Sequence, residues 1–428
     1  MRYLHRALEP TVAAAARAFP AVVLTGPRRA GKTSLLRHLR PKADYHQFED
    51  PDVVARFRND PQGFLDAVRL PAILDEIQNV PEVFNYVRSR IDRAPRRTGQ
   101  WFLTGSQEAG LMRNITESMA GRAAVLQLLP FSARESAKVV LLRGGYPEVL
   151  ARPRAAALWF SSYLQTYLER DVRGITAVQD LAVFRRFLAL VATRHGQILN
   201  KSDLAAPLGM SVPSIGRWLD ILETTGQILV VPPYYENLGK RLIKSPKIYL
   251  ADPGLACHLL GIDTDAALEK SPFLGALFEG LVAAEIVKAQ ANAGRRRELY
   301  YFRDQQGLEV DFIVPAKGGG VRLIEAKASR TVTPEAARPI ERLAAAWQGR
   351  SGGQTIVERL VVHRAPRVAT RSRALAPGVQ AMPWRDFVAR IDPPLQLGVL
   401  KGKIRYPEDS DAPLPEAVLA QFKGRKQK

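Results

Sequence analysis

The segment from Leu24 to Leu39, LTGPRRAGKTSLLRHL, constrains the fold more than any other part of the chain. It fits the pattern G-x-x-x-x-G-K-[ST] and follows the apolar run Ala21–Leu24. Glycines in such a loop let backbone N–H groups turn toward phosphate oxygens, and the N-terminus of the following helix adds positive potential. The sequence therefore predicts a strand, a phosphate-binding loop and a helix within an α/β domain.

Within this loop, each kind of residue has a predicted role toward a nucleoside triphosphate. Lys32 is expected to neutralise charge on the β- and γ-phosphates, and Thr33 to bind Mg²⁺. The residues predicted to bind the nucleotide are Gly26, Pro27, Arg28, Arg29, Ala30, Gly31, Lys32, Thr33 and Ser34. The same pattern also occurs by chance in unrelated loops, so the interpretation depends on the strands that follow.

Two later apolar runs end in polar side chains. The run Ala72–Leu74 is followed by Asp75 and Glu76, and the segment WFLTGSQ ends in Thr104 and Ser106. Because the carboxyl ends of parallel strands meet at one edge of a sheet, we expect these side chains to lie beside the phosphate-binding loop. Asp75 is predicted to hold Mg²⁺ through water, Glu76 to orient the attacking water, and Ser106 to contact the γ-phosphate. Together these strand ends predict a magnesium-dependent nucleoside triphosphatase.

Several segments resemble the AAA+-like ATP-binding proteins of bacteria and archaea whose C-terminal part is the DUF4143 region. They are LTGPRRAGKTSLL, ILDEIQNVPEVF, FLTGSQ, ESMAGRAAVLQLLPFSARE, GGYPEV, SSYLQTYLERDV, NLGKRLIKSPKIYLADPGLACHLLG and GLEVDFIV. The resemblance extends from about Arg2 to the 380s. It implies that ATP and Mg²⁺ are the cofactors. It also implies a homo-oligomer, with a hexameric ring as one candidate form.

Two arginines outside the loop each have two interpretations. Arg122 precedes the apolar run Ala123–Leu129. By the resemblance it is an arginine finger that reaches a neighbouring subunit's γ-phosphate, and the alternative is an ion pair with a local acid. Arg170 is either a second nucleotide sensor or the partner of an acid such as Glu169. The surrounding segment SSYLQTYLERDVRGI is expected to form an amphipathic helix in a lid that packs on the nucleotide domain.

The middle of the chain has the order of elements that is typical of a winged helix. A short helix is expected from Ser202 to Gly209, a second one capped by Ser211, and then strands over Ile228–Pro232 and Lys247–Leu250. In such folds the second helix enters the DNA major groove and the wing contacts phosphate. The residues predicted to contact DNA are Ser211, Ser214, Arg217, Lys240, Arg241, Lys244 and Lys247. The alternative is a module that binds protein.

The last third of the chain carries the D…E-x-K arrangement of restriction-endonuclease-like nucleases. Asp311 lies in the strand-like segment LEVDFIV, and Glu325 and Lys327 lie in VRLIEAKAS, on one face of the next strand. Glu279, on the preceding helix GALFEGLVAAEIVKA, is a further acid, and that helix is expected to be amphipathic. The acids are predicted to hold Mg²⁺, and Lys327 to position or activate the nucleophile. The alternative is an inert fold in which Lys327 pairs with Glu325 or Asp311.

Charge and composition narrow the choice of partners. The chain has 62 Lys and Arg against 42 Asp and Glu, a net charge of +20, which favours a polyanion such as DNA. Its single cysteine, Cys257, excludes a disulfide within the chain. No run of about 18 uncharged apolar residues suits a membrane, and the charged start MRYLHRALEP is unlike a signal peptide. We therefore expect a cytoplasmic protein without a membrane partner.

These observations predict an α/β protein with several domains. The predicted domains are an AAA+-like P-loop core (1–130), a helical lid (131–178), a winged helix (179–262), a restriction-endonuclease-like domain (263–392) and an extended or disordered basic tail (393–428). The predicted function is that of a magnesium-dependent ATPase that binds and remodels or processes DNA, with branched DNA among the candidates. The alternative is an ATP-switched DNA-binding regulator or defence sensor with an inert nuclease fold. A weaker third option is a scaffold that binds protein.

Overall fold

The computed structural model describes residues 3–105, 118–168, 181–234, 244–316, 320–348, 355–364 and 373–391. Met1–Pro394 form one compact unit, and Leu395–Lys428 are assigned to a second unit that lies outside the described residues. The predicted basic tail is therefore not described. Within the ranges given above, no helix has both the length and the apolar character needed to cross a membrane.

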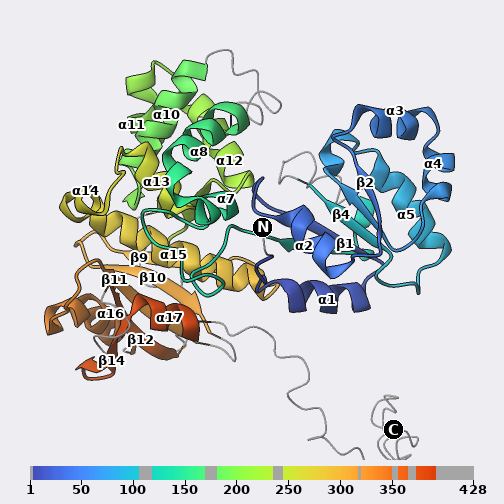
Figure 1. Cartoon of the computed structure of the whole chain (residues 1–428). Coiled ribbons are helices and arrows are strands. Elements are labelled where there is room, and N and C mark those ends of the chain that lie inside the picture. The colour runs from blue at the N-terminus through green and yellow to red at the C-terminus, as the bar shows by residue number, and fades with distance from the viewer. Residues whose placement is uncertain are drawn as a thin grey trace, which may run out of the picture. The chain divides into compact units, whose positions relative to one another are not determined.

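The N-terminal part is built on a parallel sheet of five strands in the order β2-β3-β4-β1-β5 (Figure 1). The strands are β1 Ala21–Thr25, β2 Asp44–Gln47, β3 Ala72–Asp75, β4 Trp101–Thr104 and β5 Ala123–Gln127. Since β4 lies between β1 and β3, the loops that follow all three strands open at the same edge of the sheet. The predicted α/β class with a parallel sheet is confirmed.

Helices cover both faces of this sheet because the side chains of each strand alternate between them. Val22 and Leu24 of β1 belong to an apolar cluster with residues of α1 and α2, whereas Val23 belongs to a second cluster that contains Phe57 and Phe84. The helices are α1 Glu9–Ala18, α2 Lys32–Leu39, α3 Pro51–Asn59, α4 Pro61–Ala67 and α5 Val83–Arg93. With both faces covered, β1 is fully buried and holds the start of the phosphate-binding loop rigidly.

The middle part combines short helices with a small antiparallel sheet in the order β6-β8-β7. Its elements are α10 Leu181–Thr193, β6 Gln197–Ile198, α11 Lys201–Ala205, α12 Val212–Thr224, β7 Ile228–Val231 and β8 Lys247–Leu250, followed by α13 Pro253–Leu259 and α14 Asp265–Lys270. Ser211 caps α12, as predicted, since its hydroxyl accepts the N–H of Ser214 at 3.3 Å.

A pair of short helices precedes this middle part: α7 Pro147–Ala151 and α8 Ala156–Tyr163, which runs on as a π-helix over Leu164–Leu168. The expectation that this segment packs on the nucleotide domain is only partly correct. Tyr163 is buried in the cluster that contains the middle part, and its hydroxyl lies 3.0 Å from Gln227 Nε2. A buried phenol needs a polar partner, and Gln227 supplies it. Farther along, Thr166 faces the nucleotide cavity described below.

The C-terminal part is a mixed sheet of six strands in the order β13-β14-β12-β11-β10-β9 (Figure 1). The strands are β9 Tyr300–Arg303, β10 Glu309–Pro315, β11 Val321–Lys327, β12 Ile356–His363, β13 Arg373–Ala376 and β14 Val379–Pro383. β11, β12 and β14 run parallel, and the other pairs are antiparallel. Its helices are α15 Leu274–Asn292, α16 Arg338–Gln348 and α17 Trp384–Arg390.

The helix α15 differs from its prediction as an amphipathic helix. It is buried on almost every side, because it packs in one apolar cluster with residues of the middle part and with Phe312 and Ile324 of the six-stranded sheet. Its charged residues Glu285 and Lys288 are buried as a pair, with 3.1 Å between Nζ and Oε1. Charges that the sequence pattern places on a solvent face are thus paired inside the protein.

Candidate functional site

The phosphate-binding loop has the backbone shape that its glycines predict. Gly26 has a φ of 139°, and a Cβ there would lie 2.1 Å from the carbonyl oxygen of Leu128, so only glycine fits. Gly31, with a φ of 97°, caps the start of α2. The Lys32 side chain is buried, and its ammonium donates to the carbonyls of Gly26 at 3.0 Å and Pro27 at 3.1 Å. The predicted order of strand, loop and helix is confirmed.

Asp75 and Thr33 lie together at the end of β3, as we expected from their positions after two strands. The Thr33 hydroxyl is 2.9 Å and 3.0 Å from the two carboxylate oxygens of Asp75. Tyr45 donates to the same carboxylate at 2.7 Å, and Thr104 donates to it from β4. Burial, followed by the contact with Asp75, raises the pKa of Tyr45 above its ordinary value, so its hydroxyl remains a donor. A hydroxyl beside a carboxylate is a donor set that suits Mg²⁺.

Glu76 and Arg29 have left-handed backbones with φ values of 56° and 57°. Among the described residues they are the only non-glycine residues with positive φ, and both line the same cavity. Such conformations cost free energy and cluster at functional sites. The Glu76 carboxylate accepts a hydrogen bond from the side-chain amide of Gln78. The predicted γ-phosphate contact, Ser106, lies outside the described residues.

A cavity of about 820 Å³ brings these residues together, a size ordinary for a small-molecule site. The loop, Asp75 and Glu76 form one part of its lining. The residues not anticipated from the sequence are Tyr45, Gln47, Glu49, Pro147, Glu148, Arg152 and Thr166. Of these residues, Pro147 and Glu148 belong to α7, and Arg152 lies between α7 and α8. Thr166 lies in the π-helix that continues α8. The segment GGYPEV, which contains Pro147 and Glu148, was the available signal for them.

The two arginines proposed to act on the nucleotide have different outcomes. Arg122 is half-buried and forms an ion pair with Asp92, with nitrogen–oxygen distances of 2.6 Å and 3.1 Å. The hydrogen bond from Arg122 lowers the pKa of the Asp92 carboxyl. This contact is the alternative to the arginine finger, which stays a prediction about a neighbouring subunit. Arg170 lies outside the described residues.

Of the predicted DNA contacts that the structure describes, Ser211, Arg217 and Lys244 are exposed and Ser214 is half-buried. On α12, the Ser214 hydroxyl lies 2.9 Å from the Ser211 hydroxyl and 2.9 Å from a guanidinium nitrogen of Arg217, so these three side chains form one polar patch. Lys244, before β8, is also exposed. Lys240 and Arg241 lie outside the described residues.

The acids of the C-terminal part gather around Lys247, which was predicted to contact the DNA backbone and is instead buried among these acids. Lys247, at the start of β8, is 3% exposed. Its ammonium lies 2.8 Å from Glu279 and 3.6 Å from Asp311, and it also pairs with Glu309. The Tyr249 hydroxyl donates to Glu279 as well. A basic residue at the start of a strand that is otherwise apolar was the only sequence signal for this contact.

The remaining predicted residues of this cluster also have protein partners. Lys327 donates to Glu325 at 2.7 Å, and Asp311 accepts the N–H of Ala326 at 2.9 Å. Burial, with the charge of Asp311, raises the pKa of Glu325 to about 8 and that of Glu279 to about 7. In the described ranges, one group of three acids or histidines has a ligand atom from each residue within 4.8 Å of the other two, and it consists of His5, Glu9 and His38. Glu279, Asp311 and Glu325 do not form such a group. Binding of Mg²⁺ by these three acids stays a prediction.

Several known proteins and family models are similar to this chain. A solved structure, that of the Walker-type ATPase paby2304 of Pyrococcus abyssi, is similar with a TM-score of 0.39 and 15% identity, over 59% of this chain and 94% of that chain. Models described as an AAA domain, a domain of unknown function (DUF8612) and a domain of unknown function (DUF4143) match residues 18–137, 134–266 and 274–385.

Two mycobacterial proteins are similar over most of their length. They are the uncharacterized proteins Mb2031c of Mycobacterium bovis and Rv2008c of Mycobacterium tuberculosis. Each is 35% identical over 326 residues, which is 74% of this chain and 72% of the relative. With the matched models, this identity shows that the chain belongs to the family of AAA-domain, ATPase-like proteins that carry a C-terminal DUF4143 domain.

Proposed function

We propose that this protein binds Mg²⁺–ATP in the 820 Å³ cavity and hydrolyses it, and that the nucleotide controls DNA binding by the middle part. The observation that carries the proposal is the contact between Thr33 and Asp75 beside the buried Lys32. Thr33 would bind Mg²⁺ directly and Asp75 through water, while Lys32 would exchange its carbonyl partners for phosphate oxygens.

The proposed hydrolysis uses Glu76 and cations on the cavity wall. Glu76 would orient a water molecule for attack on the γ-phosphorus, so that the bond to the β-phosphate breaks and ADP and phosphate leave. Arg29 and Arg152 line the same cavity and are candidates to stabilise the charge that develops on the phosphate oxygens. Arg152 directly follows α7, so a nucleotide in the cavity would contact the segment that packs on the middle part.

DNA is the partner that the middle part supports best. Its order of helix, strand, two helices and two strands, with β8 between β6 and β7, supports a winged helix. The polar patch of Ser211, Ser214 and Arg217 lies at the start of α12, the helix that enters the major groove in such folds. The net charge of +20 supports contact with a phosphate backbone.

For the C-terminal part, the geometry favours the inert nuclease fold over a cutting enzyme. A nuclease of this kind needs acids that are available to a divalent ion. Here the Lys247 ammonium already lies among Glu279, Glu309 and Asp311, and Lys327 is paired with Glu325. We therefore propose that this domain supports or grips DNA without cleaving it.

Turnover and DNA affinity together test the proposed function. Glu76→Gln should keep ATP binding but lose about a hundredfold or more in turnover, whereas Glu82→Gln, an exposed glutamate paired with Arg58, should turn over normally. DNA affinity should differ between ATP-bound and ADP-bound protein and fall with salt. Salt-independent binding would contradict the DNA proposal. Cleavage of DNA with Mg²⁺ or Mn²⁺ that is lost in Glu325→Ala would contradict the inert fold.

A further inference from the structure

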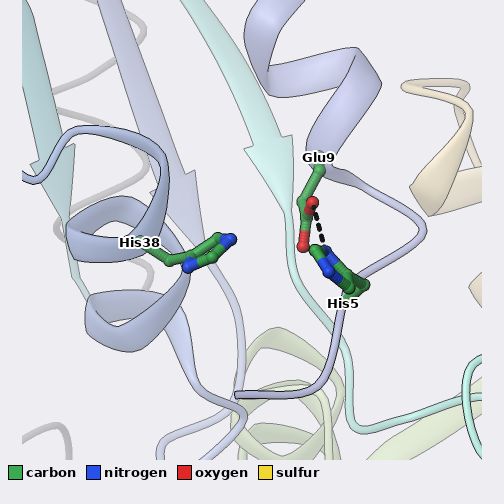
Figure 2. A group of neighbouring side chains, drawn as sticks. All are labelled: His5, Glu9 and His38. Atoms are coloured by element: carbon green, nitrogen blue, oxygen red, sulfur yellow. Dashed lines mark hydrogen bonds and ion pairs between the residues drawn. The ribbon is translucent and has the colours of Figure 1, made fainter.

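We propose that His5, Glu9 and His38 form a binding site for a divalent transition-metal ion such as Zn²⁺. One ligand atom from each residue lies within 4.8 Å of the others. Figure 2 shows the Glu9 carboxylate and the His5 ring in contact, with the His38 ring facing them from α2. None of these side chains takes part in the proposed hydrolysis, so the site would be an addition to the nucleotide site.

The donor set determines which ions suit this site. Imidazole nitrogens favour zinc, nickel, copper and cobalt over magnesium, and two histidines with one glutamate form a ligand set known for Zn²⁺. His5 Nδ1 lies 3.2 Å from Glu9 Oε2, and the His5 side chain is 80% exposed. An exposed imidazole can turn by the small amount needed to share an ion with the carboxylate. With three protein ligands, the ion would keep a position open to water.

The surroundings of the cluster orient its ligands. Glu9 Oε1 accepts the Tyr3 hydroxyl at 2.9 Å and the backbone N–H of Arg6 at 2.7 Å, which leaves Oε2 directed toward the histidines. The Tyr3 ring stacks on His38, with 3.8 Å between centroids and 17° between planes. Groups of this kind, which hold the ligands of a metal in place, raise its affinity.

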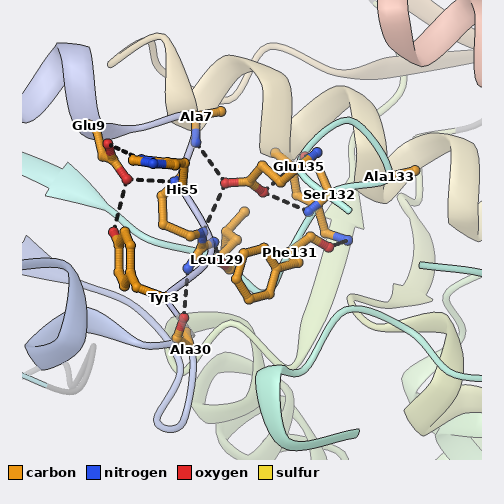
Figure 3. Close-up of polar contacts among 12 residues, drawn as sticks. Tyr3, His5, Ala7, Glu9, Ala30, Leu129, Phe131, Ser132, Ala133 and Glu135 are labelled. Atoms are coloured by element: carbon orange, nitrogen blue, oxygen red, sulfur yellow. Dashed lines mark hydrogen bonds and ion pairs between the residues drawn. The ribbon is translucent and has the colours of Figure 1, made fainter. Parts of the chain in front are cut away.

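The same segment holds the phosphate-binding loop. The buried Arg6 guanidinium donates to the carbonyls of Ala30 at 2.8 Å and Leu129 at 2.6 Å, and it pairs with Glu135 at 2.9 Å. Figure 3 shows how these contacts and those of Glu9 meet on one stretch of backbone. An ion at the proposed site would therefore join this stretch to the last turn of α2, whose first turn carries Lys32 and Thr33. The expected consequence of binding is a more stable N-terminal part.

Metal titration of the full chain tests the site. The protein is stripped with chelator, kept free of nucleotide and held in millimolar Mg²⁺, which occupies sites made only of oxygen ligands. Calorimetry with Zn²⁺ should then find one ion per chain, and Co²⁺ should develop visible absorption at the same stoichiometry. His38→Ala should weaken binding by about tenfold or more, in line with the loss caused by disturbing a metal site. Bound Zn²⁺ should raise the melting temperature of the natural protein and not that of the variant.

The control separates this cluster from ordinary surface histidines. His46 lies 3.2 Å from Asp44 and has one carboxylate partner but no second histidine, so His46→Ala should bind Zn²⁺ as the natural protein does. Glu9→Gln, which keeps an acceptor for Tyr3 and Arg6, should also weaken binding. The natural protein and His38→Ala should first have equal melting temperatures in chelator, which shows that both are folded. The proposal is overturned if they then bind Zn²⁺ equally. It is also overturned if His46→Ala removes the binding.

Discussion

The nucleotide cavity and the acidic cluster of the C-terminal part use the same residue types in opposite ways. In the cavity, the ammonium of Lys32 contacts backbone carbonyls and the carboxylate of Asp75 contacts hydroxyls. In the acidic cluster, the ammonium of Lys247 contacts carboxylates directly. The described partners of the first set are neutral groups that a phosphate or a metal ion can displace. The second set already has a charged protein partner, so the comparison teaches that partners, more than residue types, decide whether a charged site takes a ligand.

The largest expected effect comes from removing the buried cation of the acidic cluster. Lys247→Met leaves buried carboxylates without their partner and should lower the free energy of unfolding by about 3–5 kcal/mol. Lys327→Met, which removes a cation that is 39% exposed and has one partner, should cost no more than about 1 kcal/mol. Urea unfolding at pH 7 measures both. Equal losses in the two variants would show that Lys247 does not neutralise the cluster as described.

Next in size is the effect of Lys32 on turnover. Lys32→Ala should reduce ATP hydrolysis by about 10²–10³-fold, because the charge developing on the phosphates loses a cation. The fold should suffer less than in Lys247→Met, since the partners of Lys32 are neutral carbonyls. Steady-state phosphate release measures turnover, with the exposed Lys42→Ala as the control. Normal hydrolysis by Lys32→Ala would place the nucleotide elsewhere.

His195 extends the comparison to a buried titratable group that has no charged partner among the described residues. Its Nδ1 accepts the N–H of Leu250 at 3.0 Å, and burial lowers its pKa to about 4. The unfolded chain binds a proton at this histidine near pH 6.5, so the contribution of His195 to stability should fall as the pH drops from about 6.5 to about 4 and stay constant above that range, with a total change of about 3 kcal/mol. Urea midpoints across pH for the natural protein and His195→Gln measure the difference. Parallel curves would show that His195 titrates normally.

The smallest effect on stability is expected at the exposed ion pair of Arg122 and Asp92. Arg122→Ala should leave the melting temperature almost unchanged, because such pairs are screened by solvent. If Arg122 also serves a neighbouring subunit, the turnover of the natural protein should rise with protein concentration and that of the variant should not. If turnover is independent of protein concentration in both the natural protein and Arg122→Ala, the role of Arg122 is limited to its ion pair with Asp92.

The features that sequence analysis predicted well are local ones. The loop from Gly26 to Thr33 and the cap at Ser211 depend on neighbours within a few residues, and the acids after β3 follow from the direction of a parallel strand. Lys247 was predicted to contact DNA, and this prediction was wrong because its partners, such as Glu279 and Asp311, come from distant segments that only the tertiary fold brings together. α15 was predicted incorrectly because charge normally marks a solvent face, whereas Glu285 and Lys288 satisfy each other inside.

The short segment that holds both Tyr163 and Thr166 has a consequence for timing. The Tyr163 side chain is buried against the middle part, and Thr166 faces the nucleotide cavity. The two residues lie on adjacent turns of continuous helix. No flexible linker separates them, so movement at one end displaces the other immediately. Rapid mixing with ATP should therefore show DNA affinity changing in the same kinetic phase as nucleotide binding, without a slower step in between.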